Sequence, residues 1–110
     1  MNLDQKTRIR ELNDAFRRSF DGGRVMLTTG VQSLGGSELA ILLTRVRCFE
    51  EFGAGNDPHQ EHDFGSVEIE SVTYFWKIDY YDREQRCGSE DPSDPDQTTR
   101  VLTIMQAAEY

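Results

Sequence analysis

The sequence predicts a single α+β domain over residues 1–110, built from a mostly antiparallel four-stranded sheet with two helices packed on one face. Two segments carry apolar residues at helical spacing, and four shorter segments carry the β-branched and aromatic residues that are typical of strands. The elements follow the order helix, strand, helix and then three strands, which indicates helices lying against one sheet. A chain of 110 residues is long enough for one hydrophobic core.

The first predicted element is a helix that ends at Asp21-Gly22-Gly23, where glycine can take the left-handed cap conformation. Residues three or four positions apart give it an apolar face: Ile9, Leu12, Phe16 and Phe20. Its solvent face is expected to carry Arg8, Glu11, Arg17 and Arg18. Residues 24–31, RVMLTTGV, are rich in Val, Leu and Thr and predict the first strand.

The second predicted helix carries the strongest amphipathic pattern in the chain. We expect Ser37 to be its N-cap, with Glu38 beside the positive end of the helix. Its apolar stripe is formed by Leu39, Leu42, Leu43, Val46, Phe49 and Phe52. This stripe predicts a face that packs against the core, and Gly53 and Gly55 end the helix.

Three further strands are predicted in the second half. Residues 66–70 alternate, with Val67 and Ile69 directed inward, and a short connection at Ser71 predicts a hairpin with residues 72–82. That second strand is apolar on both sides, which indicates a central strand covered on both faces; its apolar residues are Tyr74, Trp76, Ile78 and Tyr80 on one side and Phe75 and Tyr81 on the other. Residues 83–97 form a loop, residues 98–106 the last strand, and residues 107–110 a frayed or helical tail.

Composition narrows the classes of function. The net charge of −8 argues against direct binding of nucleic acid, which Lys and Arg drive by releasing counterions. No apolar run is long enough to span a membrane and no signal-peptide segment stands at the N-terminus, so we expect a cytoplasmic protein with no membrane partner. Cys48 and Cys87 lie far apart and outside any CxxC motif, which favours free thiols, although a disulfide between them stays open.

The acidic charge lies in the second half of the chain. Residues 1–47 hold eight Lys and Arg against five Asp and Glu, whereas residues 48–110 hold four against fifteen. We expect folding to collect the later carboxylates into a continuous negative face that binds a basic protein. The predicted binding residues, which include one tyrosine as an aromatic anchor, are Asp57, Glu61, Asp63, Glu68, Glu70, Asp79, Tyr81, Asp82, Glu90, Asp91 and Asp94.

The segment GNDPHQEHDFG offers a second hypothesis, because it concentrates histidines and carboxylates ahead of a strand. His59, His62 and Asp63 could supply metal ligands, and a metal-dependent hydrolase using them together with Asp79 is the alternative function. The spacing does not match a known helical metal motif, and no nucleophile elbow or phosphate-binding loop occurs. The ordinary interpretation is a turn at Asn56-Asp57-Pro58 and a same-face Lys77–Asp79 pair.

Several of these segments also carry a family resemblance. The strings EHDFG, YFWKIDYYD, DPSDP and TTRVLTIM resemble a family of small bacterial proteins of unknown function, common on chromosomes and mobile elements, whose members share NDPxxEHDFG, FFWKIDYYD and TTRVLTIMxAxEY. The similarity covers residues 24–110, and the matching positions are Asn56 to Pro58, Glu61 to Gly65, Phe75 to Asp82 and Thr98 to Met105. The resemblance implies that these segments belong to one site or one core, and it implies no reaction.

The favoured hypothesis is therefore a small acidic protein without enzymatic activity or cofactor. It would inhibit a bacterial defence protein by occupying its basic nucleic-acid-binding surface, in the manner of an anti-CRISPR or anti-restriction protein that mimics nucleic acid. The sequence leaves open whether the chain is a monomer or a homodimer formed through a sheet edge.

Overall fold

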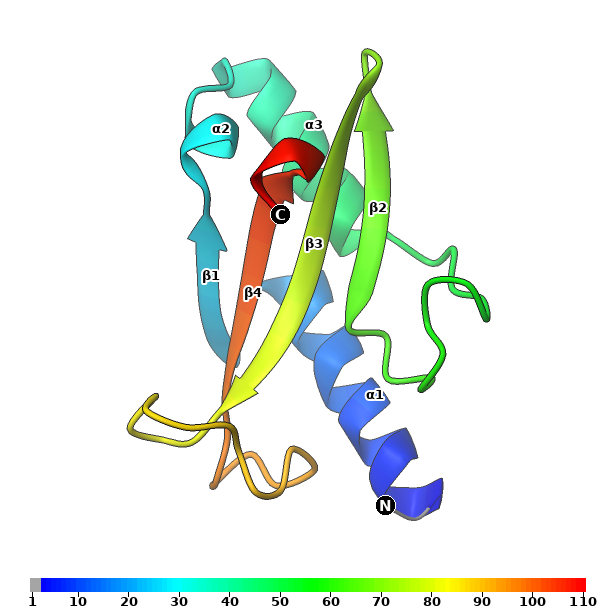
Figure 1. The fold of residues 1–110 in the computed structure, drawn as a ribbon, viewed down its shortest axis with the longest axis vertical. Coiled ribbons are helices and arrows are strands. Elements are labelled where there is room, and N and C mark those ends of the chain that lie inside the picture. The colour runs from blue at the N-terminus through cyan, green and yellow to red at the C-terminus, as the bar shows by residue number, and fades with distance from the viewer. Residues whose placement is uncertain (1–2) are drawn as a thin grey trace.

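The computed structural model describes residues 3–110. Two longer helices, α1 (Leu3–Ser19) and α3 (Gly36–Arg47), lie behind a sheet in Figure 1, and a short helix, α2 (Thr29–Gln32), follows the first strand. The strands are β1 (Gly23–Leu27), β2 (Phe64–Ile69), β3 (Val72–Tyr81) and β4 (Thr99–Gln106), and the 3-10 helix η1 (Ala107–Glu109) ends the chain. No helix within the described range is long and apolar enough to cross a membrane.

The four strands form one sheet in the order β1-β4-β3-β2. The pairs β2–β3 and β3–β4 are antiparallel, whereas β1 runs parallel to β4. The predicted α+β class and the mostly antiparallel sheet are thus confirmed, with one parallel pair that the sequence did not reveal. Gly23 allows this pairing, because a Cβ there would lie 2.5 Å from the carbonyl oxygen of Arg100 and 2.7 Å from Cζ of Phe16.

The predicted β2–β3 hairpin is confirmed, and its two-residue turn is formed by Glu70 and Ser71 in place of the asparagine and glycine that this geometry favours. Glu70 and Ser71 both have positive φ, at 50° and 69°. Two consecutive residues in this region form a type I′ turn, whose twist matches that of the paired strands.

The core lies between the sheet and the two longer helices. Phe16 from α1 and Leu42 and Val46 from α3 join one buried cluster with Trp76 and Leu102 from the sheet. The predicted inward face of β3 is buried at Tyr74, Trp76 and Ile78. The opposite face of β3 is only half-buried, and there Phe75 contacts the rings of Phe64 and Tyr110.

Two predicted element ends are wrong. The strand predicted over 24–31 stops at Leu27, because the chain turns into α2 and carries Val31 into the core. The second helix ends at Arg47, although Phe49 and Phe52 still pack against the core from the following loop. An irregular segment can continue the apolar spacing of a helix, because that spacing reflects which side chains are buried and not whether the backbone is helical.

Three predictions about individual residues can be compared with the structure, of which two are wrong and one is confirmed. The N-cap of α3 is Gly35, so the prediction of Ser37 is wrong: the helix begins at Gly36, two residues earlier than predicted, and encloses Ser37. Arg17, expected in solvent, is completely buried because its guanidinium group binds carbonyl oxygens beyond α1. Cys48 and Cys87 are exposed free thiols, as expected.

Candidate functional site

The loop before β2 is fastened to α1 through His62. Its Nδ1 lies 2.9 Å from Oδ1 of Asp14, and its Nε2 lies 3.5 Å from Oδ2 of Asp57. The backbone N–H of His62 donates to Asp57 at 3.0 Å, and the imidazole stacks on the ring of Phe52 with centroids 3.7 Å apart. Because both ring nitrogens face carboxylates, His62 serves here to hold the loop against the helix.

The other residues of the proposed metal site do not converge on His62. His59 is exposed, and Asp79 is bound to Lys77 at 2.6 Å, which confirms the same-face pair. Burial raises the pKa of Asp63, and the neighbouring Glu61 charge raises it further. Among residues 3–110, no group of three or more His, Cys, Asp and Glu side chains could hold a metal ion. His59, His62, Asp63 and Asp79 therefore do not come together as one cluster in the described structure.

Glu61 is the half-buried end of a chain of polar side chains that leads inward to Asn13 and Arg100. The Tyr80 hydroxyl donates to Glu61 at 2.8 Å, and the fully buried Asn13 donates to Tyr80 at 2.7 Å. Arg100 Nε in turn donates to Oδ1 of Asn13 at 2.8 Å. Burial raises the pKa of Tyr80, so this hydroxyl stays protonated. Two predicted binding residues, Asp57 and Glu61, thus have their carboxylates engaged inside the molecule.

Apart from Asp63, which directly precedes β2, the remaining predicted binding residues lie in two groups at opposite ends of the sheet. Glu68 and Glu70 are exposed at the β2–β3 turn, at the top of Figure 1. The other group lies at the far end of β3 and in the loop that follows, at the bottom of the figure; it consists of Asp79, Tyr81, Asp82, Glu90, Asp91 and Asp94. The sequence hypothesis of one continuous face is therefore reduced to the second group.

The segment of residues 89–98, called the acidic loop below, is held in shape by its own side chains. Oδ1 of Asp91 accepts from the backbone N–H of Ser93 at 3.1 Å, and the Thr98 hydroxyl donates to the Asp91 carbonyl oxygen at 2.9 Å. Asp94 accepts from the N–H of Asp96 at 2.9 Å and from the Gln97 amide at 2.7 Å. These two hydrogen bonds, the Gln97 one first, lower the pKa of Asp94. The carboxylates of Asp91 and Asp94 are thus held in place by hydrogen bonds within the loop.

No carboxylate of the acidic loop forms a salt bridge in the described structure: the two arginines that reach the loop, Arg83 and Arg100, donate to the backbone carbonyl oxygens of Pro95 and Pro92. The loop contains Glu90, Asp91, Asp94 and Asp96, and no Lys or Arg stands between Cys87 and Thr99. The salt bridges of the described residues all lie elsewhere. The loop therefore presents four carboxylates without salt-bridge partners at one end of the molecule.

Sequence reasoning missed the buried polar residues that position these loops: Asn13, Arg17 and Arg100. Their spacing was a usable signal. Asn13 stands four residues after Ile9 and three before Phe16, on the apolar stripe, and Arg100 alternates with the buried Leu102. A polar residue at such a position indicates a buried hydrogen-bond network.

Comparison with known proteins bears out the resemblance to a family without an assigned activity. No curated protein and no solved structure matches the chain. The model of one family, described as protein of unknown function (DUF3768), matches residues 27–109 and so covers every strand of the sheet except most of β1. The chain belongs to this family.

Proposed function

We propose that this protein is a non-enzymatic interaction protein whose acidic loop binds the basic nucleic-acid-binding surface of a partner protein. The partner is proposed to be a bacterial defence protein, such as a restriction or CRISPR effector, met in the cytoplasm and inhibited by mimicry of nucleic acid. The observation that carries this proposal is the acidic loop itself, with four carboxylates within residues 90–96 and no described salt bridge.

The order within the acidic loop favours binding. A flexible acidic tail loses conformational entropy when it docks, whereas a loop already fixed by the Asp91 and Asp94 hydrogen bonds loses less. Fixed carboxylates also present their charge in one pattern, as the phosphates of a nucleic acid do. Such a pattern steers a basic partner during encounter and competes for its arginines.

Exposed carboxylates lie both in the acidic loop and at the β2–β3 turn, so removal of charge from the loop can be compared with removal of the same charge from the turn. Glu90 and Asp96 are exposed and their side chains accept none of the loop hydrogen bonds described above, so E90Q with D96N removes two charges and keeps the loop shape. E68Q with E70Q removes the same charge from the opposite end of the sheet. We expect the first double variant to bind the partner about fivefold to thirtyfold more weakly at low salt and the second to bind as the parent does, since each rim charge contributes up to about 1 kcal/mol.

The experiment begins with capture of partners from a nuclease-treated bacterial lysate on the immobilised protein. The captured partner is purified, and its dissociation constant is measured at low and high salt with the parent and both double variants. The proposal expects a basic nucleic-acid-binding protein that nucleic acid displaces and that high salt releases. Capture of no such protein, or equal weakening by the two double variants, would overturn it.

A further inference from the structure

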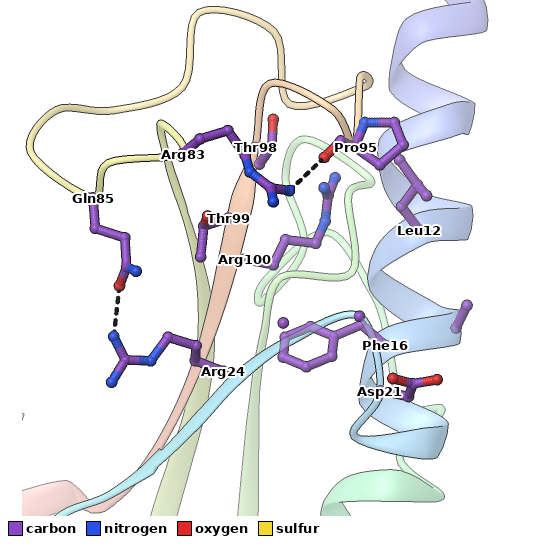
Figure 2. A pocket seen from close by; sticks show the side chains of 13 residues that line it. Leu12, Phe16, Asp21, Arg24, Arg83, Gln85, Pro95, Thr98, Thr99 and Arg100 are labelled. Carbon is purple, nitrogen blue, oxygen red and sulfur yellow. Dashed lines mark hydrogen bonds between the residues drawn. The ribbon is translucent and has the colours of Figure 1, made fainter.

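A second feature lies beside the acidic loop, where α1 ends and β1 begins. Here a pocket of about 630 Å³ opens between the helix, the strand and the loop (Figure 2). Leu12, Ala15 and Phe16 of α1 form its apolar side, and Pro95 and Thr98 face them from the acidic loop. Three arginines also line the pocket: Arg24, Arg83 and Arg100.

Arg100 is the unusual member of this group, because its charge is buried. Its residue is only 3% exposed, and no carboxylate within the described part of the chain forms a salt bridge with it. Nε donates to Asn13, Nη2 donates to the Pro92 carbonyl oxygen, and the guanidinium group lies over the Tyr80 ring at 5.2 Å. The direct partners of this cation are thus neutral, and the Glu61 charge acts on it only through space, so an anion in contact with the guanidinium group would stabilise it.

One nitrogen of Arg100 is left for such an anion. Nη1 has no hydrogen-bond partner among residues 3–110, and it is not enclosed, since the only fully enclosed unpartnered side-chain nitrogen or oxygen in that range is Nε1 of Trp76. Because Arg100 is one of the residues that line the pocket, Nη1 is the nitrogen of this side chain available to an anion bound there. Figure 2 shows its guanidinium group between the acidic loop and α1.

The other two arginines are also free of carboxylates in the described structure. Arg83 donates to the Pro95 carbonyl oxygen at 3.4 Å, and Arg24 donates to the Gln85 side chain at 2.8 Å. The only acidic residue that lines the pocket is Asp21. Three positive groups and one negative group leave a formal charge of +2, in a chain whose net charge is −8. The lining of the pocket is thus positive, although the molecule as a whole is negative.

We propose that this pocket binds a small organic phosphate. A phosphate monoester carries close to two negative charges at neutral pH, which match the charge of the pocket, and guanidinium groups donate to phosphate oxygens with favourable geometry. The pocket exceeds the size of an oxyanion alone, and its apolar side on α1 accommodates the organic group. This inference concerns a small molecule and is independent of the proposed protein partner.

Phenyl phosphate is a suitable probe because it joins a phosphate to a flat apolar group. Calorimetric titration of the whole protein is expected to show one site for phenyl phosphate, weaker binding of inorganic phosphate, and weaker binding of benzoate, which offers a carboxylate and the same ring. Failure of phenyl phosphate to bind at millimolar concentration would overturn the proposal. Benzoate binding as tightly as phenyl phosphate would overturn the assignment to phosphate.

Variants of exposed arginines test the position of the site. Arg83 is exposed, so R83Q should leave the fold intact and weaken phenyl phosphate binding about tenfold or more. The matched control is R86Q, since Arg86 lies in the same connection, is exposed and pairs only with the exposed Glu84 at 3.7 Å, outside the pocket. We expect R86Q to keep the parent affinity. Equal loss in both variants would indicate a general effect of net charge and would contradict the proposed site.

Discussion

Arg17 shows how much one buried side chain contributes to this fold. Its Nε donates to the Val46 carbonyl oxygen at 3.1 Å and its Nη2 to that of Phe49 at 2.9 Å, where α3 ends. Arg17 adds a second donor to the Val46 carbonyl oxygen, which also accepts from the Phe49 N–H at 3.3 Å, and it gives a partner to the Phe49 carbonyl oxygen in the segment after the helix. Burial lowers the pKa of Arg17, and the adjacent Asp14 carboxylate acts in the opposite direction.

Replacement of Arg17 by lysine should therefore be costly although the charge is kept. An ammonium group cannot reproduce the planar fork that reaches two carbonyl oxygens and Asp14 at once, and we expect R17K to lose about 2–4 kcal/mol of unfolding free energy. Urea denaturation measures this loss. The control is R18K, because the Arg18 side chain is 56% exposed and lies 3.8 Å from Glu50, so its effect should stay within about 0.5 kcal/mol. Similar losses in both variants would contradict this role of Arg17.

The sequence predicts single residues well where burial is apolar and less well where it is polar. Trp76 and Leu42 follow their spacing into the core. Arg17 does not, because residue type alone assigns an arginine to solvent, and its burial depends on carbonyl groups about 30 positions later in the chain. The partners of His62 are hidden for the same reason: Asp14 lies on the first helix, and only the folded chain brings the two together.

At the scale of elements, the β2–β3 hairpin depends on the absence of a side chain at Gly65. Gly65 is paired with Trp76 across the two strands, and a Cβ at Gly65 would lie 2.4 Å from Nε1 of that indole. Trp76 is completely enclosed by core residues, so it has little room to move. Glycine here is a packing requirement of the strand pair.

The substitution G65A should destabilise the protein by about 1–3 kcal/mol, because the added methyl group overpacks the core beside Trp76. Thermal unfolding followed by tryptophan fluorescence measures the effect and also reports displacement of the indole. G53A is a suitable comparison, since no atom lies within 4 Å of the position of its Cβ. An unchanged midpoint for G65A would show that the hairpin adjusts without cost.

The existence of each longer element could be predicted from periodicity, but several ends could not. Leu27 and Val31 both read as strand residues, and only the turn into α2 separates them. Likewise Phe49 continues the stripe of α3 after the helix has ended. Apolar spacing records which side chains are buried, whereas the end of an element depends on where backbone groups find partners.

At the scale of the whole molecule, Glu109 joins the first half of the chain to the last. Its carboxylate accepts from the Thr28 hydroxyl at 2.6 Å, from the Gly30 N–H at 2.9 Å and from the Gln106 N–H at 2.8 Å. These hydrogen bonds, that of Thr28 first, lower the pKa of Glu109 below its ordinary value of 4.5. The folded protein therefore prefers the ionised carboxylate.

This preference gives a defined pH dependence. The pKa of Glu109 is lower in the folded state than in the unfolded state. Its contribution to the free energy of unfolding is therefore complete above the unfolded-state pKa, near 4.5, and is lost as the pH falls through the folded-state pKa. We expect E109Q to unfold more easily than the parent at pH 7, and the difference between them to shrink progressively below about pH 4.5. Urea midpoints at several pH values provide the measurement. A difference that stays constant down to pH 3 would contradict the linkage, and E11Q, on the exposed side of α1, is the control.

At this scale, the parallel pairing of β1 with β4 could not be predicted from the sequence. The order of elements predicts a sheet, but the parallel contact of β1 with β4 joins residues more than 70 positions apart. The position of the charged residues on the fold was likewise not predictable. Composition reveals that the second half of the chain is acidic, but Glu68 and Glu70 are separated from the acidic loop because the β2–β3 turn lies at the other end of the sheet.

The parallel pairing of β1 with β4 also bears on synthesis of the protein. β1 finds its only neighbour in a strand that the ribosome makes after residue 98, so β1 emerges long before it has anything to pair with. Contacts between such distant segments carry a large entropic cost of loop closure and slow the folding reaction. Until β4 has been made, β1 has no strand to pair with, and the core still lacks Leu102 and Ile104.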